Sequence, residues 1–476
     1  MRFIKLCSLV LLLLLLIILS ANGCGRRGPG AGNAGTLGGI MRVQEPVEVL
    51  TLMGHEFHYY WFMLAERRMA EAWRETGRGE FVLELTLYSH ENELNHFISL
   101  QTMLAAGYGY DMFMLPMGFQ IMVHFLAKAG HLADIFGLID QCRYRGRDDY
   151  FTNAFNMFTT GERLYGFPLV FSFEYVAINT KLPEHFIDMF KSLSYITTEQ
   201  LIQFYLELMD HYPQEFGHLE ITNSVMFASL YDLVHQRTTG FVDFEAGTSN
   251  LTDQEFINYL EYVRRLVLHD GLSPGVFVHD FRLMSQEEMN VRAAQFAFWT
   301  AATGNTAINA FFPPEEDPYF THFIPLSNEC GELIARTRLL FCFSETGNST
   351  LAWEFMQYLQ DAFADAHQNF AQTPFLTAFD IPVARDLFDI YFENWFSDGT
   401  VRVLLSDAVY RFDENSRDDA LARLYRYSQM PISPLPVVPL YYIFDITDLL
   451  INDIINAENA AHRLHNMVES FLSERR

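Results

Sequence analysis

Few residues in this chain stand in spacings that could perform chemistry. His55 and His58 are three residues apart in His55-Glu56-Phe57-His58, and two imidazoles placed in this way could contribute to a metal site. The pattern differs from His-Glu-x-x-His, and the sequence identifies no third ligand. The sequence contains neither a Gly-x-Ser-x-Gly turn nor a Gly-Lys-Ser/Thr phosphate loop. We therefore predict no catalytic residue, no metal site and no cofactor.

Carboxylates are the remaining source of chemistry, because the chain has 59 Asp and Glu. Two of them facing a cleft could act as acid and base on a glycosidic bond, but sequence spacing cannot select such a pair. A secreted glycan hydrolase or lyase is therefore an alternative function. Glu56 and Tyr88 are examples of polar and aromatic residues that follow two apolar runs. Because ligands of open α/β sheets lie beyond the carboxyl ends of the strands, we expect such residues at the rim of a binding cleft.

Alternating strands and helices must position these side chains. Apolar runs predict strands, and segments with apolar residues every three or four positions predict helices between them. This alternation is typical of parallel βαβ units. The predicted strands are 47–53, 81–88, 111–116, 173–179, 295–301 and 333–343. The predicted helices are 57–76, 96–106, 118–129, 198–210, 224–236, 253–270, 350–361 and 446–474, the last with one break.

The first 23 residues have the composition of an export signal. Arg2 and Lys5 precede an apolar run at 6–19, which is shorter than the roughly 20 residues that span a bilayer. The following Ser20-Ala21-Asn22-Gly23-Cys24 resembles the lipobox of bacterial lipoproteins, in which the cysteine becomes the lipidated first residue after cleavage. We therefore expect a lipoprotein signal peptide at 1–23 and lipidation at Cys24. An ordinary secretion signal with an incidental cysteine is the alternative.

A Gly-rich stretch at 24–43 predicts a flexible tether between the lipid and the folded part. Without the leader, three cysteines remain in the folded part: Cys142, Cys330 and Cys342. This odd number argues against a disulfide framework. One bridge between Cys330 and Cys342 is possible, but buried free thiols are the favoured interpretation.

Composition narrows the class of protein further. Half of the 476 residues are hydrophobic, which excludes a disordered chain. The net charge of −27, which becomes −29 without Arg2 and Lys5 of the leader, argues against a nucleic-acid partner. It also favours a neutral or cationic solute, although the local charge of a cleft can differ from the net charge.

Several short motifs, in this order, resemble those of extracellular solute-binding protein family 1, the sugar-type lipoproteins of bacterial ABC importers. The chain departs from the family at Thr197-Thr198-Glu199-Gln200-Leu201, where a Trp is missing, and in extra sequence between Phe375 and Pro439. The motifs that carry the resemblance are Asp111-Met112-Phe113-Met114, Leu126 to Ile135, Gly161 to Pro168, Phe173 to Asn179 with Lys181, Gln295 to Trp299, Ala352 to Leu359 and Ile381 to Arg385.

The resemblance implies an α/β fold of the periplasmic-binding-protein type (type II), with a ligand cleft between two lobes. We expect lobe 1 at 44–166 and 321–365, and lobe 2 at 167–320 and 366–476. Polar groups would bind ligand hydroxyls, and aromatic faces would stack on sugar rings. The candidate ligand-binding residues are Glu56, Tyr88, Glu174, Trp299, Arg336 and Trp395.

The function implied by the resemblance is solute capture outside the cytoplasm. A monomer anchored in the membrane by its lipid would close on a small solute, expected to be a sugar or oligosaccharide, and deliver it to ABC permease subunits. Hinge closure would shift the open–closed population when ligand contacts both lobes. A module that presents its ligand to a membrane sensor is a second alternative to this function.

Overall fold

The described part of the chain begins at β1, and the predicted leader at 1–23, Cys24 and the tether at 24–43 lie outside it. The computed structural model describes residues 47–115, 120, 122–142, 144–216, 220–222, 230–243, 246–270, 296–302, 320–368, 381–395, 400–402, 409–411, 414–433 and 441–473. Within these ranges, no helix is both long and apolar enough to cross a bilayer.

The first predicted strands and helices are confirmed. Parallel pairing joins β1 to β2 over the whole of both strands, and β1 to β3 at Leu52 and Met53. The bounds of this part are β1 (Val47–His55), α2 (Tyr59–Thr76), β2 (Glu80–Tyr88), α3 (Glu93–Ala105), β3 (Met112–Leu115) and α4 (Met122–Lys128).

Helix α2 shows why these segments fold as predicted. It buries one stripe of side chains at helical spacing, formed by Trp61, Phe62, Ala65, Met69 and Trp73. The helix ends at Gly77, whose φ of 66° lies in the left-handed region that glycine adopts without a Cβ penalty. The stripe packs α2 against the sheet of the first hydrophobic core.

Strand β6 (Phe167–Asn179) is the central element, and all of its residues are buried. Its first half pairs antiparallel with β13 (Ala335–Phe343) and β14 (Ile381–Pro382). Its second half pairs antiparallel with β11 (Phe296–Ala302) and β12 (Phe320–Ser327). The predicted start of this strand at Phe173 was therefore six residues late.

The remaining strands extend the sheet at both sides. Its order is β2-β1-β3-β13-β6-β11-β8, with β12 joined to β6 and to β7. The smaller strands are β7 (Ile196–Thr197), β8 (Glu220–Thr222), and the pairs β4 (Thr159–Thr160) with β5 (Arg163–Leu164), β9 (Val242–Asp243) with β10 (Thr248–Ser249) and β15 (Thr400–Arg402) with β16 (Val409–Arg411).

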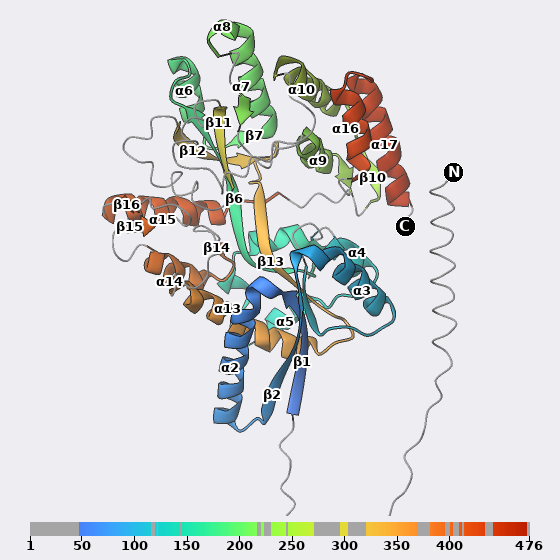
Figure 1. Cartoon of the computed structure of the whole chain (residues 1–476), viewed down its shortest axis with the longest axis vertical. Helices are drawn as coiled ribbons and strands as arrows, with labels where there is room; N and C mark the ends of the chain where they lie inside the picture. The colour runs from blue at the N-terminus through green and yellow to red at the C-terminus, as the bar shows by residue number, and fades with distance from the viewer. Residues whose placement is uncertain are drawn as a thin grey trace, which may run out of the picture. The chain divides into compact units, whose positions relative to one another are not determined.

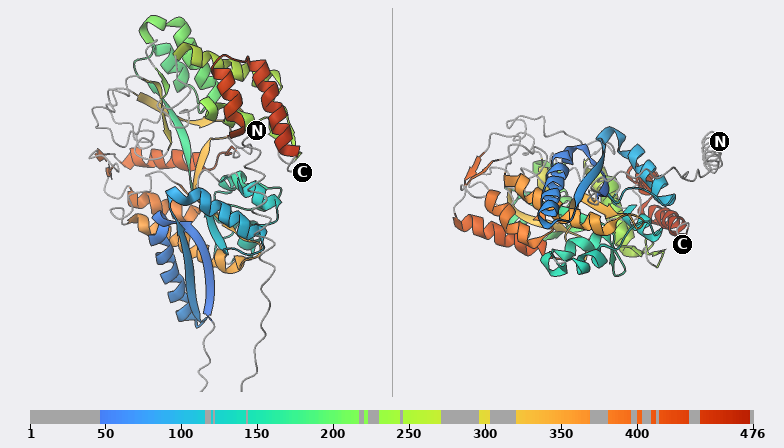
Figure 2. Two further views of the ribbon diagram at one scale, coloured as in Figure 1. Left: turned by 45° about the vertical axis from the view of Figure 1, so that its right-hand side comes forward. Right: turned by 90° about the horizontal axis from the view of Figure 1, so that it is seen from below.

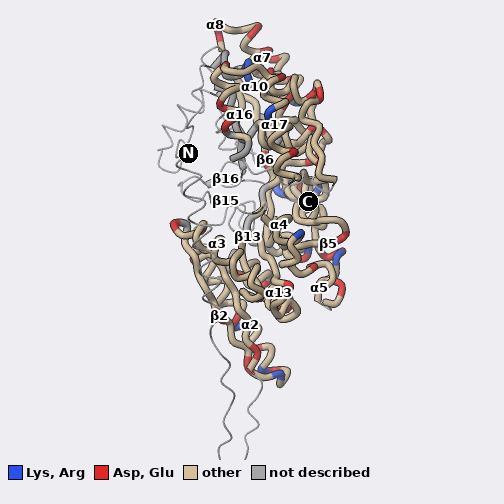
Figure 3. The backbone as a smooth tube through the Cα atoms, turned by 90° about the vertical axis from the view of Figure 1, so that its right-hand side faces the viewer, with Lys and Arg blue, Asp and Glu red and all other residues tan. Residues whose placement is uncertain are grey.

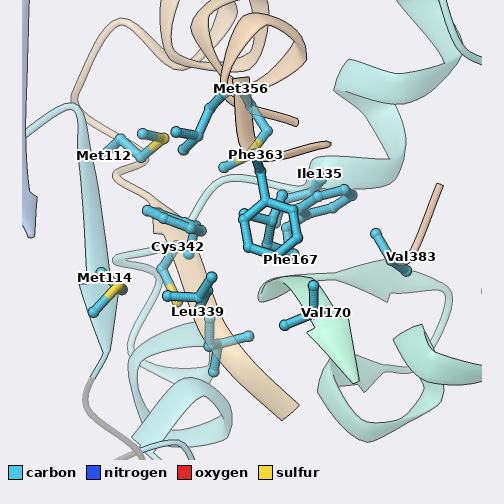
Figure 4. Close-up of a cluster of buried hydrophobic side chains, with 14 of the residues drawn as sticks. Met112, Met114, Ile135, Phe167, Val170, Leu339, Cys342, Met356, Phe363 and Val383 are labelled. Carbon is cyan, nitrogen blue, oxygen red and sulfur yellow. The ribbon is translucent and has the colours of Figure 1, made fainter. Parts of the chain in front are cut away.

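Two separate hydrophobic cores surround this sheet. The first contains side chains from β1, β3, β13 and the first half of β6, including Met112, Phe167, Leu339 and Cys342 (Figure 4). Helices α2 and α3 contribute to it together with α5 (Ile135–Gln141), α13 (Ser349–Gln368), α14 (Arg385–Trp395) and α15 (Glu414–Ser428).

The second core contains Val176 and Ile178 from the other half of β6. Helices α16 and α17 pack together and beside α10 in it (Figures 1 and 2). Its helices are α6 (Glu184–Lys191), α7 (Thr198–His211), α9 (Leu230–Thr239), α10 (Gln254–Asp270), α16 (Tyr441–Ile451) and α17 (Ala457–Ser473), and the short α8 (Pro213–Phe216) follows α7.

The packing differs in one segment from the lobe limits expected from the sequence. Phe388 and Phe392 of α14 and Leu424 of α15 are buried in the first core, whereas the sequence assigned 366–476 to the second lobe. The physical reason is that β14 adds to the first half of β6 and holds α14 beside α13. The limits of the two lobes otherwise stay predictions.

Cysteines and charges are distributed as follows. Cys142, Cys330 and Cys342 are all free thiols, so no Cys330–Cys342 bridge is present. Of these three thiols, only Cys342 is buried, and Cys330 is exposed, which corrects the expectation of buried thiols.

Acidic residues are spread over the described part of the chain. They occur on elements of both cores, for example on α8 and α2, rather than in one block (Figure 3).

Candidate ligand-binding site

Residues after β1 form a tight turn at the carboxyl edge of the parallel strands. His55 is 5% exposed, and its Nδ1 accepts a hydrogen bond of 3.2 Å from the backbone N–H of Phe57. This bond starts the 3₁₀ turn at Glu56–His58, in which Glu56 is exposed. A Cβ on Gly54 would overlap the ring of Phe62, so α2 packs directly against the end of β1. The predicted site residue Glu56 thus projects from a well-fixed turn.

Tyr88 ends β2 and is part of the core in this structure. Its side chain is 1% exposed, and its hydroxyl donates a hydrogen bond of 3.2 Å to the carbonyl oxygen of Met114. The His55 ring lies edge-on to it, with centroids 5.1 Å apart. Burial, and then the charge of Glu93, raise the pKa of Tyr88 well above its usual value, so the phenol remains a donor. Tyr88 therefore connects the ends of β2 and β3.

Three exposed aromatic rings stand beside Glu56. Phe57, Tyr59 and Tyr60 are 46%, 50% and 51% exposed. They lie at the turn after β1 and at the start of α2, where the sequence predicted a cleft rim. Rings of this kind can stack on the apolar face of a sugar or pack against another protein.

Two buried polar residues lie where β6 passes from the first core to the second. Ser172 and Glu174 are 3% and 1% exposed, and their spacing of two residues places them on one face of the strand. On that face they stand between Val170 of the first core and Val176 of the second. The Ser172 hydroxyl has no hydrogen-bond partner among the described residues, which is costly unless a ligand or water supplies one.

The strand register places this pair beyond the carboxyl ends of the parallel strands. Leu115, the last residue of β3, pairs with Leu340 of β13, and Ser172 pairs with Arg336, four residues before Leu340 and thus beyond the end of the antiparallel β3. The chain after β3 reaches the same region, because the side-chain amide of Gln120 donates to the carbonyl oxygen of Thr337 at 3.0 Å. The carboxyl edge therefore opens toward Ser172, as expected of a ligand site in an open α/β sheet.

The next residue on β6 faces the other way and contacts α15. Tyr175 must point to the face opposite Glu174, because side chains alternate along a strand. Its ring centroid lies 6.1 Å from that of Tyr427 on α15. Burial raises the pKa of Tyr175 well above its usual value, the charge of Tyr427 adds to this, and nearby Arg423 opposes it. The charge of Arg423 on α15 therefore acts on Tyr175, the residue next to Glu174 in β6.

The structure brings three of the six predicted site residues to neighbouring strands. Glu174 is on β6, Arg336 pairs with Ser172 on β13, and Trp299 pairs with Ala177 on β11. The side chains of Trp299, Arg336 and Trp395, the last residue of α14, lie outside the described part.

Glu56 and Tyr88 lie at the carboxyl ends of β1 and β2, strands that are not direct neighbours of β6 in the sheet. Sequence reasoning missed Ser172 and Gln120. A signal for Ser172 was present, since it is a polar residue two positions before Glu174 in an otherwise apolar strand.

His55 and His58, the two imidazoles whose spacing could contribute to a metal site, have no third ligand identified among the described residues. The two rings lie 5.8 Å apart, centroid to centroid, and His55 Nε2 lies 3.8 Å from Glu93 Oε1. Nowhere in the described ranges do three His, Cys, Asp or Glu side chains gather in a way that could hold a metal ion. His58 instead stacks on Trp61, with centroids 4.8 Å apart.

Comparison with known proteins identifies the fold. No protein-family model and no curated protein sequence matches the chain. Among solved structures, the sugar-binding protein MalE from Xanthomonas citri matches with a TM-score of 0.58 and 12% identity, over 90% of this chain and 98% of that one.

Two further solved structures match over similar lengths. The cyclic alpha-maltosyl-1,6-maltose binding protein from Arthrobacter globiformis matches with a TM-score of 0.55 and 14% identity, over 90% of this chain and 100% of that one. The extracellular solute-binding protein family 1 member from Alicyclobacillus acidocaldarius matches with a TM-score of 0.52 and 12% identity, over 90% and 99%. The chain therefore has the two-lobe α/β fold of ABC-type solute-binding proteins.

Proposed function

We propose that this chain is an extracytoplasmic solute-binding lipoprotein that captures a carbohydrate between its lobes and delivers it to an ABC permease. The observation that carries the proposal is the crossing of β6, where Ser172 and Glu174 stand on one face between the two cores. Solved structures of the same fold are sugar-binding proteins by name, which supports a carbohydrate as the solute.

Hinge closure is the mechanism that this arrangement favours. A solute bound at Ser172 and Glu174 contacts a strand shared by both cores, so it can interact with groups of both lobes only when they close. The hydroxyl of Ser172 and the carboxylate of Glu174 would bind sugar hydroxyls. A sugar that lacks a matching hydroxyl would leave a buried polar group unpaired, at about 1–3 kcal/mol, which gives the site its selectivity.

Ligand-induced stabilisation tests this function. The chain from residue 24 onward is screened by thermal shift against neutral and acidic mono- and oligosaccharides, amino acids and polyamines, and hits are titrated by calorimetry. We expect saturable binding of at least one sugar with a stoichiometry near one. Turnover of the sugar at low enzyme concentration would instead support the glycan hydrolase or lyase. Absence of any sugar among the hits would refute carbohydrate capture.

Variants locate the site once a sugar is found. Glu174→Gln keeps the shape and removes the charge, and Trp299→Ala removes a ring. Each should weaken sugar binding about tenfold or more and change the melting temperature less than binding. A large loss of melting temperature with unchanged affinity would make the residue part of the core. Glu184→Gln, at the first turn of α6, serves as a charge control.

The lipid anchor has its own test. Cys24→Ser should release the protein from the membrane fraction and abolish its labelling by a fatty-acid analogue, because the thiol would be the attachment atom. Unchanged fractionation and labelling would show that Cys24 is not lipidated, and the ordinary secretion signal would then hold.

A further inference from the structure

Three segments of the chain pass between the two cores at the same level. The first is β6, which crosses at Glu174 and runs beside β13 through the middle of the molecule (Figure 1). The second is the hairpin between β12 and β13, because Leu326 is buried in the second core and Leu333 in the first. The third follows α15, since Ile432 is buried in the first core and α16 in the second.

Backbone hydrogen bonds join these segments side by side. The N–H of Glu174 donates to the carbonyl oxygen of Ile334 at 3.0 Å. On the other side of the hairpin, the N–H of Leu333 donates to Pro431 at 2.8 Å, and the N–H of Ser433 donates to Leu333 at 2.9 Å. The three crossings therefore form one short ladder, and a rotation between the cores must bend all three segments together.

The tip of the hairpin is a turn organised by the side chain of Asn328. Its Oδ1 accepts hydrogen bonds of 3.0 Å from the backbone N–H groups of Cys330 and Glu332. Its Nδ2 donates to Glu332 Oε2 at 2.7 Å. Gly331 has a φ of 78°, in the left-handed region that suits glycine. These bonds within the turn hold residues 328–332 together as one unit.

The turn is attached to helices of the second core. Glu329 Oε1 lies 3.9 Å from Arg237 Nη1 on α9, and Arg237 Nη2 lies 3.6 Å from Glu199 Oε2 on α7. The side chain of Arg237 is 10% exposed, so water screens these ion pairs less than pairs on an open surface. The turn should therefore move with α7 and α9 when the cores rotate.

The segment that contains Ser433 is attached to the first core instead. Its neighbour Ile432 is 2% exposed in that core. Just before it, the side-chain amide of Asn153 donates to the carbonyl oxygens of Ser428 and Met430, at 2.7 and 2.6 Å. Residues on both sides of Asn153 belong to the turn that lines the first core. Ser433 should therefore move with the first core.

One side-chain hydrogen bond joins these two parts. The Nδ2 of Asn328 donates to the hydroxyl of Ser433 at 3.2 Å. We propose that this interlobe hydrogen bond stabilises the relative position of the lobes in this structure, and that Asn328 and Ser433 are positioning residues of hinge closure. Asn328 moves with the second core and Ser433 with the first, so rotation about the ladder separates the two atoms. The role in solute binding rests on the proposed function, whereas the bond between the lobes does not.

Removal of the Ser433 hydroxyl tests this role. Ser433→Ala leaves the bonds of Asn328 within its own turn in place. The ratio of the lobe arrangements should shift about two- to tenfold away from the present one, the range expected for the loss of one hydrogen bond. Ser433→Thr keeps a hydroxyl and should retain the wild-type ratio. Ser192→Ala is the matched control, because the Ser192 hydroxyl donates to the carbonyl oxygen of Met189 at the exposed end of α6.

Pulsed EPR measures the ratio in the absence of sugar. Spin labels are attached at Arg74→Cys on α2 and Asn459→Cys on α17, which are exposed positions on helices of different cores. The chain runs from residue 25 onward and carries Cys142→Ser and Cys330→Ser, and the remaining Cys342 is buried. The distance between the labels then reports the relative position of the lobes.

Two results would overturn the proposal. One is a distance distribution of Ser433→Ala that coincides with that of Ser192→Ala, and the other is an equally large shift in Ser433→Thr. Equal melting temperatures of the two alanine variants would show that both are folded. Neither result bears on sugar capture, because the measurement contains no sugar.

Sugar binding gives a second measurement. A sugar found by the thermal-shift screen should bind Ser433→Ala with a Kd that differs from the wild-type Kd by the same factor as the binding-competent fraction. An unchanged Kd beside shifted distances would overturn the link between this hydrogen bond and solute binding.

Discussion

The most specific stability prediction concerns the side chain of Asp111. Its carboxylate accepts three hydrogen bonds of 2.7 Å, from the backbone N–H and the hydroxyl of Thr51 and from the backbone N–H of Asn348. The Asp111 backbone N–H in turn donates to the Thr51 hydroxyl at 2.9 Å. One side chain therefore connects β1, β3 and the turn before α13, which explains the aspartate that leads the third strand.

The magnitude follows from these bonds. Asp111→Ala leaves two backbone donors and one hydroxyl without their acceptor, at about 0.5–1.5 kcal/mol each. Because Asp111 is half-buried, water replaces part of the loss, and we expect about 2–4 kcal/mol in total. For a cooperative unit of roughly 150–250 residues this lowers the melting temperature by about 4–16 °C. Asp111→Asn retains one accepting oxygen and should lose about half as much.

Scanning calorimetry measures the effect against a matched control. Asp418→Ala also removes an aspartate, but the Asp418 side chain is 69% exposed and forms an ion pair with its sequence neighbour Arg417. It should change the melting temperature by about 1 °C or less. If Asp111→Ala and Asp418→Ala gave equal melting temperatures, the hydrogen-bonded role of Asp111 would be refuted.

Two further predictions concern titrating side chains. In a chain that begins after Cys24 and so has three thiols, we expect Cys330 to react fastest with a disulfide reagent, because it is exposed, whereas Cys142 is half-buried and burial raises the pKa of Cys342 and shields it. Cys330→Ser should remove the fast phase, and three thiols should react after denaturation; a denatured count of one would reveal a bridge. Burial lowers the pKa of His124, so the unfolded chain binds the proton first as pH falls below about 6.5. The wild type should therefore lose more stability than His124→Gln between pH 7 and pH 5, and equal losses would contradict this reasoning.

The sequence predicted the elements whose side chains follow one clear period. Val47–His55 is a mostly apolar run that ends just after Gly54, and Tyr59–Thr76 carries one helical stripe ending at Gly77. Helix α15 was missed because its apolar residues are few, and Glu414–Ser428 is mostly polar. The start of β6 was placed late because Pro168 interrupts the run, and a proline lacks the N–H that a ladder normally uses.

Long-range neighbours could not be predicted in this way. Glu174 was identified as a site residue, but the pairing of Ser172 with Arg336 joins positions 164 residues apart. Likewise, Arg423 approaches Tyr175 and His322 only because α15 returns to the first core late in the chain. No local period encodes such contacts, since they depend on the packing of whole elements.

The crossing of β6 constrains how the two lobes could move. Up to Phe173 the strand pairs with β13, and from Glu174 onward it pairs with β11, so the partners change within two residues. Beside this point β12 shifts register between Thr321 and Ile324, where His322 has a φ of 55°, a conformation that is uncommon outside glycine. Ladder bonds resist bending elsewhere along β6, so closure would concentrate its rotation here. A solute on the Glu174 face would then act directly at this pivot, so its affinity and the closed population of the lobes would be linked.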